Sequence, residues 1–136
     1  MAPPNDAAGP GPRILIVDDQ QSNVRLLEQT LRRAGFAEVM STVEPREVAA
    51  LHSEHHYDLI LLDLQMPEMN GLQVMEGLQE GRLTNPVSIL VLSADATQTP
   101  AALKAGADSF LGKPFRLPDV VERVQGMLKT AAAARP

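Results

Sequence analysis

The sequence predicts an α/β fold in which helices cover both faces of a single doubly wound parallel sheet. Apolar runs of strand length alternate five times with segments of helical periodicity. Several of these runs are apolar throughout, which is typical of strands buried on both faces. With 136 residues, 44% of them hydrophobic, the chain has the size of one ordinary domain and can bury a substantial core.

The chain begins with a predicted tail, followed by the first strand and the first helix. Residues 1–12 carry four prolines and two glycines and have little to bury, so we expect a disordered tail before a domain spanning residues 13–129. Ile14 to Val17 are branched apolar residues and form the first expected strand. The first helix carries apolar residues at helical spacing, namely Val24, Leu27, Leu31 and Ala34. Gly35 is expected to end this helix.

Two further pairs of strand and helix are expected in the middle of the chain. The second strand covers about Glu38 to Thr42, and the second helix begins beside Pro45, because proline fits the first turn of a helix. The third strand is Leu59 to Leu62, and the third helix begins near Gly71. Both helices carry apolar residues at helical spacing, which gives each of them a face to pack on the sheet.

The last part of the chain supplies the remaining elements. The fourth strand is Val87 to Leu92. Thr99 and Pro100 are typical of a helix cap and a first-turn proline, so the fourth helix is expected to start late and to be short, about two turns long. A short fifth strand around Ser109 to Leu111 precedes a last helix with an unbroken apolar stripe. Residues 130–136 are expected to be a C-terminal tail or the start of a linker.

Composition and charge argue against several classes of protein. The chain has no cysteine, which excludes disulfides and thiolate metal sites and fits a reducing, cytoplasmic compartment. No apolar stretch approaches the length of about 20 residues that spans a bilayer, and the N-terminus lacks the pattern of a secretory signal, so we expect no membrane segment. A net charge of -5 and the lack of a basic cluster with interleaved aromatic residues argue against direct nucleic-acid binding.

Polar residues follow the strand-like runs at their C-terminal ends. Asp18 and Asp19 follow the first run, Asp63 the third, Ser93 the fourth and Lys113 the short last one. Right-handed crossovers would bring all of these ends to one edge of a parallel sheet, where ligands bind in open α/β folds. The three carboxylates are therefore expected to be neighbours.

Three clustered carboxylates at neutral pH must either bind protons more tightly or hold a cation. With oxygen ligands only, the cation expected here is a hard one such as Mg²⁺, which combines one or two carboxylates with waters and a phosphoryl oxygen. Lys113 adds a positive charge and Ser93 a hydroxyl donor. A metal ion, an ammonium group and a hydroxyl around one carboxylate make a site for a phosphoryl group.

Five short motifs in this order resemble the receiver domain of bacterial two-component response regulators, over about Arg13 to Lys129. The resemblance implies a flavodoxin-like fold with five parallel strands in the order 2-1-3-4-5 and five helices, the fourth of them short here. The motifs are VDD (Val17 to Asp19), LLDLQMPEMNG (Leu61 to Gly71), LSA (Leu92 to Ala94), AGAD (Ala105 to Asp108) and FLGKPF (Phe110 to Phe115).

The resemblance assigns roles to individual residues. It implies that Asp63 is the phosphoacceptor, which takes a phosphoryl group from the phosphohistidine of a histidine kinase or phosphotransfer protein. The implied Mg²⁺ ligands are Asp19, Asp63 and the backbone carbonyl of Gln65, with Asp18 acting through a metal-bound water. Ser93 and Lys113 match the hydroxyl and the lysine that contact the phosphoryl group. Such a domain is no conventional enzyme, although it catalyses its own phosphorylation and dephosphorylation.

Further positions match the residues that tune and report phosphorylation in the family. Gln65 and Asp95 stand where residues adjust the rate of dephosphorylation, and we expect a phosphoryl lifetime of seconds to minutes. Phe110 stands at the aromatic switch position, and the bond between Lys113 and Pro114 is expected to be cis. Phosphorylation would move Ser93 toward the new oxygens and let Phe110 turn into the space this leaves.

The expected output is contact with a target protein through the face of the fourth helix, the fifth strand and the fifth helix. A phosphorylation-dependent dimer is left open, as is the choice between a stand-alone regulator and a module of a longer protein. Between Ser93 and Lys113 the chain is about two residues shorter than is usual in the family, and the missing length falls before the Ala105 motif. This departure concerns the output face and not the phosphorylation residues.

Two other functions remain as alternatives. An aspartate-nucleophile phosphatase would carry Asp-x-Asp after its first strand, whereas Asp18 and Asp19 are adjacent. A receiver that is not phosphorylated and serves as a protein-binding module usually lacks an acid or the lysine, and none is lost here. The triplet of His52, His55 and His56 has two members at metal-binding spacing, but no third ligand is evident, so we interpret it as the solvated end of the second helix.

Overall fold

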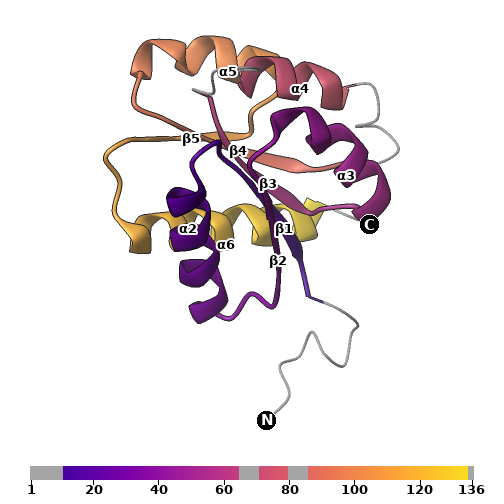
Figure 1. Ribbon diagram of the computed structural model, residues 1–136, viewed down its shortest axis with the longest axis vertical. Helices are drawn as coiled ribbons and strands as arrows, with labels where there is room; N and C mark the ends of the chain where they lie inside the picture. The colour runs from indigo at the N-terminus through magenta and orange to yellow at the C-terminus, as the bar shows by residue number, and fades with distance from the viewer. Residues whose placement is uncertain (1–10, 65–70, 80–85, 135–136) are drawn as a thin grey trace.

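The computed structural model describes residues 11–64, 71–79 and 86–134, and the predicted fold is confirmed within them (Figure 1). Five parallel strands form one sheet in the order β2-β1-β3-β4-β5. The strands are β1 (Arg13–Val17), β2 (Glu38–Thr42), β3 (Leu59–Asp63), β4 (Ser88–Ser93) and β5 (Ser109–Gly112). The helices are α2 (Gln21–Arg33), α3 (Val48–His55), α4 (Gly71–Gln79), α5 (Thr99–Ala105) and α6 (Leu117–Ala134), with 3-10 turns at η1 (Pro45–Glu47) and η2 (Ala96–Gln98).

Helices lie on both faces of the sheet and enclose two apolar cores. Figure 1 shows α3, α4 and α5 on one side of the sheet and α2 and α6 on the other. Alternate residues of each central strand supply the two cores, so that Leu15 and Val17 face the first layer while Ile14 and Ile16 face the second. Because both faces of the strands are covered, the strands carry the unbroken apolar runs seen in the sequence. Within the described ranges, no helix has the length and apolar character to cross a bilayer.

Two arginines connect helices to the outer strands of the sheet. Arg32 of α2 donates to the carbonyl of Val39 on β2, at 2.7 Å. Arg123 of α6 donates to the carbonyl of Phe110 on β5 at 3.0 Å and to the hydroxyl of Ser109 at 2.6 Å. Each guanidinium thus adds a polar contact between a helix and an outer strand to the apolar packing of the same layer.

The predicted helix starts need correction at two places. The segment after Glu44 begins as a 3-10 turn, in which the Glu44 carboxylate accepts the N–H of Arg46 at 3.2 Å before α3 continues from Val48. Thr99 is not a cap, because α5 begins at Thr99 itself and Gln98 precedes it with no side-chain hydrogen bond. The short length predicted for this helix is confirmed. The predicted domain boundaries stay predictions, and α6 continues past residue 129 to Ala134.

The interpretation of all three histidines as a solvated helix end is wrong for His52. Its side chain is buried, with 4% of its surface exposed, and its Nδ1 accepts the backbone N–H of Tyr57 at 3.0 Å. The two rings are also stacked, with centroids 6.1 Å apart. His56 is exposed, as expected, and adopts a left-handed conformation at the end of α3. His52 therefore stabilises the turn that leads from α3 into β3.

Replacement of Gly71 by alanine is expected to destabilise the fold. A β-carbon on Gly71 would lie 2.6 Å from a methyl carbon of Leu64, 2.9 Å from its α-carbon and 3.0 Å from the carbonyl oxygen of Asp63. Overpacking of this kind costs about 1–3 kcal/mol, to be measured as the free energy of unfolding in urea. Gly77→Ala in the same helix is the matched control, because nothing lies within 4 Å of its added carbon; it should be neutral or stabilising.

Replacement of His52 by phenylalanine tests the hydrogen bond to Tyr57. The variant keeps an aromatic ring for stacking but leaves the buried N–H of Tyr57 without this acceptor, at a cost of about 1–3 kcal/mol in the free energy of unfolding. Ser53→Ala, at the exposed next position of α3, should change stability little. Equal stability of the His52→Phe variant and the native chain would contradict the role given to His52.

Candidate functional site

The carboxyl ends of the central strands bring the polar residues together at one edge of the sheet. Asp18 directly follows β1, Asp63 is the last residue of β3, and Ser93 is the last residue of β4. The strand register places Asp63 opposite Leu92 and Ser93 opposite Gly112, so that Lys113 continues directly from β5 at the same level. This arrangement follows from the parallel sheet, because all its strands end at the same edge.

Three carboxylates form a compact cluster at this edge. One oxygen from each of Asp18, Asp19 and Asp63 lies within 4.8 Å of the others. Asp18 and Asp63 are buried, with 2% and 5% of their surface exposed, whereas Asp19 is the most exposed of the three. Buried like charges at this separation repel strongly, since little water lies between them to screen the charges.

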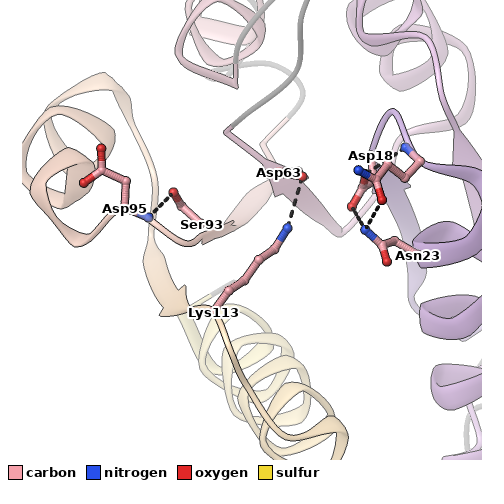
Figure 2. Close-up of polar contacts among 7 residues, drawn as sticks. Asp18, Asn23, Asp63, Ser93, Asp95 and Lys113 are labelled. Atoms are coloured by element: carbon pink, nitrogen blue, oxygen red, sulfur yellow. Dashed lines mark hydrogen bonds and ion pairs between the residues drawn. The ribbon is translucent and has the colours of Figure 1, made fainter.

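Lys113 provides a positive charge inside this cluster. Its Nζ lies 3.2 Å from Oδ2 of Asp63 (Figure 2), and its side chain is half-buried. Among the residues that the structure describes, one ammonium group thus faces three carboxylates, and the resulting excess of negative charge favours a further cation. Because all the ligand atoms are carboxylate oxygens, the residues fit a hard divalent ion such as Mg²⁺. Gln65, the expected fourth ligand through its carbonyl, lies outside the described residues.

Asp18 is held by donors from the start of α2. Its Oδ1 accepts the backbone N–H of Gln20 at 2.9 Å, and its Oδ2 accepts from the Asn23 amide at 3.4 Å. Burial raises the pKa of Asp18, and the neighbouring Asp63 adds to this rise, whereas the Gln20 N–H and Lys113 oppose it. A cation between the acids would favour the ionised form. Asn23 was not among the residues singled out from the sequence, although it lies just one helical turn beyond Gln20.

Ser93 is completely buried and connects the end of β4 to the segments on either side. Its hydroxyl accepts the backbone N–H of Asp95 at 3.1 Å, and its carbonyl accepts the N–H of Lys113 at 2.8 Å. A serine hydroxyl that accepts one hydrogen bond can also donate its own proton. The Asp95 carboxylate points away from Asp63 in Figure 2 and is bound instead by Thr97. The expectation that Asp95 tunes dephosphorylation stays a prediction.

The two remaining expected positions lie on and just after β5. Phe110 pairs in register with Val91 of β4 and packs, partly buried, against the core beneath α4 and α5. The bond between Lys113 and Pro114 is cis, as expected. Beside these residues, a cavity of about 310 Å³ opens between α2 and the segment after β5. Its lining is mostly apolar and reaches the charged cluster at Asp18 and Lys113. This cavity was not predicted from the sequence, because residues far apart in the chain line it.

Comparison with known proteins gives one consistent result. The family model described as the response regulator receiver domain matches residues 14–125. The transcriptional regulatory proteins PrrA of Mycobacterium tuberculosis and SrrA of Staphylococcus aureus are 38% and 39% identical over 126 and 116 residues, which are 91% and 85% of this chain. These matches cover 53% and 47% of the two relatives, so the chain spans about half their length.

Solved structures of similar fold agree with this result. The chemotaxis protein CheY4 of Vibrio cholerae is 26% identical, with a TM-score of 0.78 over 85% of this chain and 98% of that one. A CheY-like response regulator receiver domain protein of Methanospirillum hungatei is 25% identical, with a TM-score of 0.81 over 91% of this chain and 98% of that one. Both neighbours are matched over nearly their whole length.

The raised pKa of Asp18 predicts a pH dependence of stability in the absence of metal. A carboxyl whose pKa is higher in the folded than in the unfolded chain binds its proton more tightly when folded, so its contribution to stability falls as pH rises above the ordinary value of 3.8. We expect the free energy of unfolding of Asp18→Asn to rise relative to that of the native chain as pH rises from about 4 to about 7. Urea unfolding in a chelator at a series of pH values measures this gain.

Addition of Mg²⁺ should then make the native chain more stable than the Asp18→Asn variant. Binding to the folded state alone stabilises it by about 2.7 kcal/mol at a hundredfold excess over the dissociation constant. The native chain should gain this amount at pH 7 and the Asp18→Asn variant less, since it lacks one of the clustered charges. A difference between the two proteins that does not vary with pH or with Mg²⁺ would contradict the electrostatic account of the cluster.

Proposed function

The chain belongs to the response regulator receiver family, and we propose that it is a signalling domain phosphorylated on Asp63 by a phosphohistidine. The phosphodonor is a histidine kinase or a phosphotransfer protein. The observation that carries the proposal is the ion pair of 3.2 Å between Lys113 Nζ and Asp63, at the centre of a cluster of acids. A lysine that faces the phosphoacceptor pairs equally well with a phosphoryl group placed on it.

Asp63 is the nucleophile of the proposed reaction. One of its carboxylate oxygens attacks the phosphorus, the bond from phosphorus to the imidazole nitrogen breaks, and an aspartyl phosphate results. Asp19, Asp63 and the Gln65 carbonyl would hold Mg²⁺, with Asp18 acting through a water, and the ion would supply positive charge next to the transferred group. Lys113 balances the charge of the phosphoryl oxygens, and the Ser93 hydroxyl donates to one of them. The same residues would position water for hydrolysis, with Gln65 and Asp95 adjusting its rate.

The switch starts from the charge that phosphorylation adds to a buried site. A phosphoryl group brings about two negative charges and three strong acceptors. Ser93, whose hydroxyl accepts from the Asp95 N–H in the present state, would turn toward the new oxygens. Phe110, partly buried beside this segment, would follow, and the face of α5, β5 and α6 would change shape for a target protein or a second copy.

The relatives add a second route for output. PrrA and SrrA are named transcriptional regulatory proteins, and this chain spans about half of each. Control of transcription through a further protein segment is therefore an alternative to contact with a separate target. A non-phosphorylated receiver or an aspartate-nucleophile phosphatase is less well supported, because Asp18, Asp63 and Lys113 are all present and arranged around one site. Cytoplasmic location stays a prediction from the lack of cysteine.

Incubation with Mg²⁺ and a small phosphodonor tests the proposal directly. The native chain should gain one phosphoryl group by intact mass, and Asp63→Asn should gain none, because the amide is not a nucleophile. Lys113→Met should be folded but slower to react, since it lacks the ammonium group beside the phosphoryl oxygens. Removal of Mg²⁺ by a chelator should abolish the reaction of the native chain. A phosphorylated Asp63→Asn variant, or an inert native chain, would refute the assignment.

A further inference from the structure

A fourth carboxylate, that of Asp95, lies close to the cluster but faces away from it. Figure 2 shows its oxygens on the side opposite Asp63 and Lys113, while its backbone N–H points to Ser93. The Oδ1 atom accepts both the backbone N–H of Thr97, at 3.0 Å, and the Thr97 hydroxyl. Two donors from a single residue thus fix the orientation of this charge.

The Asp95 carboxylate is close enough to influence Asp63 if it turns. Ser93 ends the strand next to that of Asp63; parallel neighbours are about 4.8 Å apart, and two residues of extended chain reach about 7 Å. The backbone of Asp95 therefore stands at most about 13 Å from that of the phosphoacceptor, a distance comparable with one screening length of roughly 10 Å at 0.1 M salt. Facing Asp63, the carboxylate would add a negative charge to a site that Lys113 only partly neutralises.

Thr97 supplies the contacts that keep the Asp95 carboxylate from turning toward Asp63. Its hydroxyl and its N–H both favour the ionised carboxylate and lower the pKa of Asp95. Thr97 is exposed on η2, so burial in the core does not hold its side chain in place. The backbone N–H would remain in any substituted chain, and the hydroxyl is therefore the part of this contact that a substitution can remove.

We propose that Thr97 is a positioning residue that holds the Asp95 carboxylate away from Asp63 and so sets the rate at which an anionic phosphodonor phosphorylates the site. The inference rests on the proposed function, since it presupposes phosphorylation of Asp63. With the hydroxyl in place, an incoming phosphoryl group meets only the three clustered acids and their cation. Without it, only the N–H of Thr97 holds the carboxylate, which can then turn toward the donor more readily and repel it.

The test compares the native chain with Thr97→Val, which keeps the shape and the backbone N–H but removes the hydroxyl. Initial rates of phosphorylation are measured at saturating Mg²⁺ with acetyl phosphate and with the less charged phosphoramidate. Thr97→Val should be slower by about two- to fivefold with acetyl phosphate at low salt, as expected for one added charge at this range. The reduction should be smaller with phosphoramidate and should nearly vanish at about 1 M salt.

Three control variants separate charge from structure. Thr99→Val removes a hydroxyl two residues further along and should react like the native chain. Asp95→Asn removes the charge, and in that background Thr97→Val should have no further effect on the rate. Thermal unfolding of all four variants identifies any that is not folded. If the single Thr97→Val variant is unstable, Thr97→Ala, which also removes the hydroxyl and keeps the Asp95 charge, takes its place and should show the same slower reaction.

The outcomes distinguish this inference from the proposed function. If the native chain accepts no phosphoryl group from either donor, the proposed function fails and this inference fails with it. If the native chain is phosphorylated but Thr97→Val reacts at the same rate, only the role of Thr97 is refuted. A reduction that persists at high salt, or in the Asp95→Asn background, would also refute it, because a purely structural effect does not depend on the charge of Asp95.

Discussion

The repulsion between two buried carboxylates, Asp18 and Asp63, is the constraint on which the site depends. Neither side chain is exposed enough for water to screen it, and a single ammonium group, that of Lys113, lies beside them. A fold that needed only stability would place apolar side chains at these strand ends. The cost of keeping acids there makes sense if a cation binds at this place, since its positive charge offsets the excess of negative charge.

The strands and the gathering of acids were the predictable part of the structure. Strands covered on both faces need apolar residues at every position, so runs such as Ile14–Val17 are recognisable without knowledge of their partners. Each predicted strand starts within one residue of the start of the observed strand. The ends of parallel strands meet at one edge whatever the details of the loops, which is why Asp18, Asp63 and Lys113 could be grouped from sequence alone.

The starts of helices and the local side-chain bonds were harder to predict. Threonine is a common helix cap, but here a turn comes directly before α5, and Thr99 is already the first residue of the helix. In that turn Asp95, and not Thr99, accepts a backbone N–H with its side chain. The neighbours of His52 in the sequence are mostly polar, which suggested that it is exposed. Its burial depends on a reversal of the chain that brings Tyr57 back against its ring. Such bonds depend on backbone geometry over a few residues, and residue type alone does not determine that geometry.

The hydrogen bond between the Ser93 carbonyl and the Lys113 N–H restricts how the two residues can move. Both are proposed to contact the same phosphoryl group, one through its hydroxyl and one through its ammonium group, and this bond joins their backbones at 2.8 Å. A shift of one main chain would therefore carry the other with it. A hinge beyond Ser93 would leave this bond intact, so that the segment leading to α5 could move while the two strand ends keep their positions.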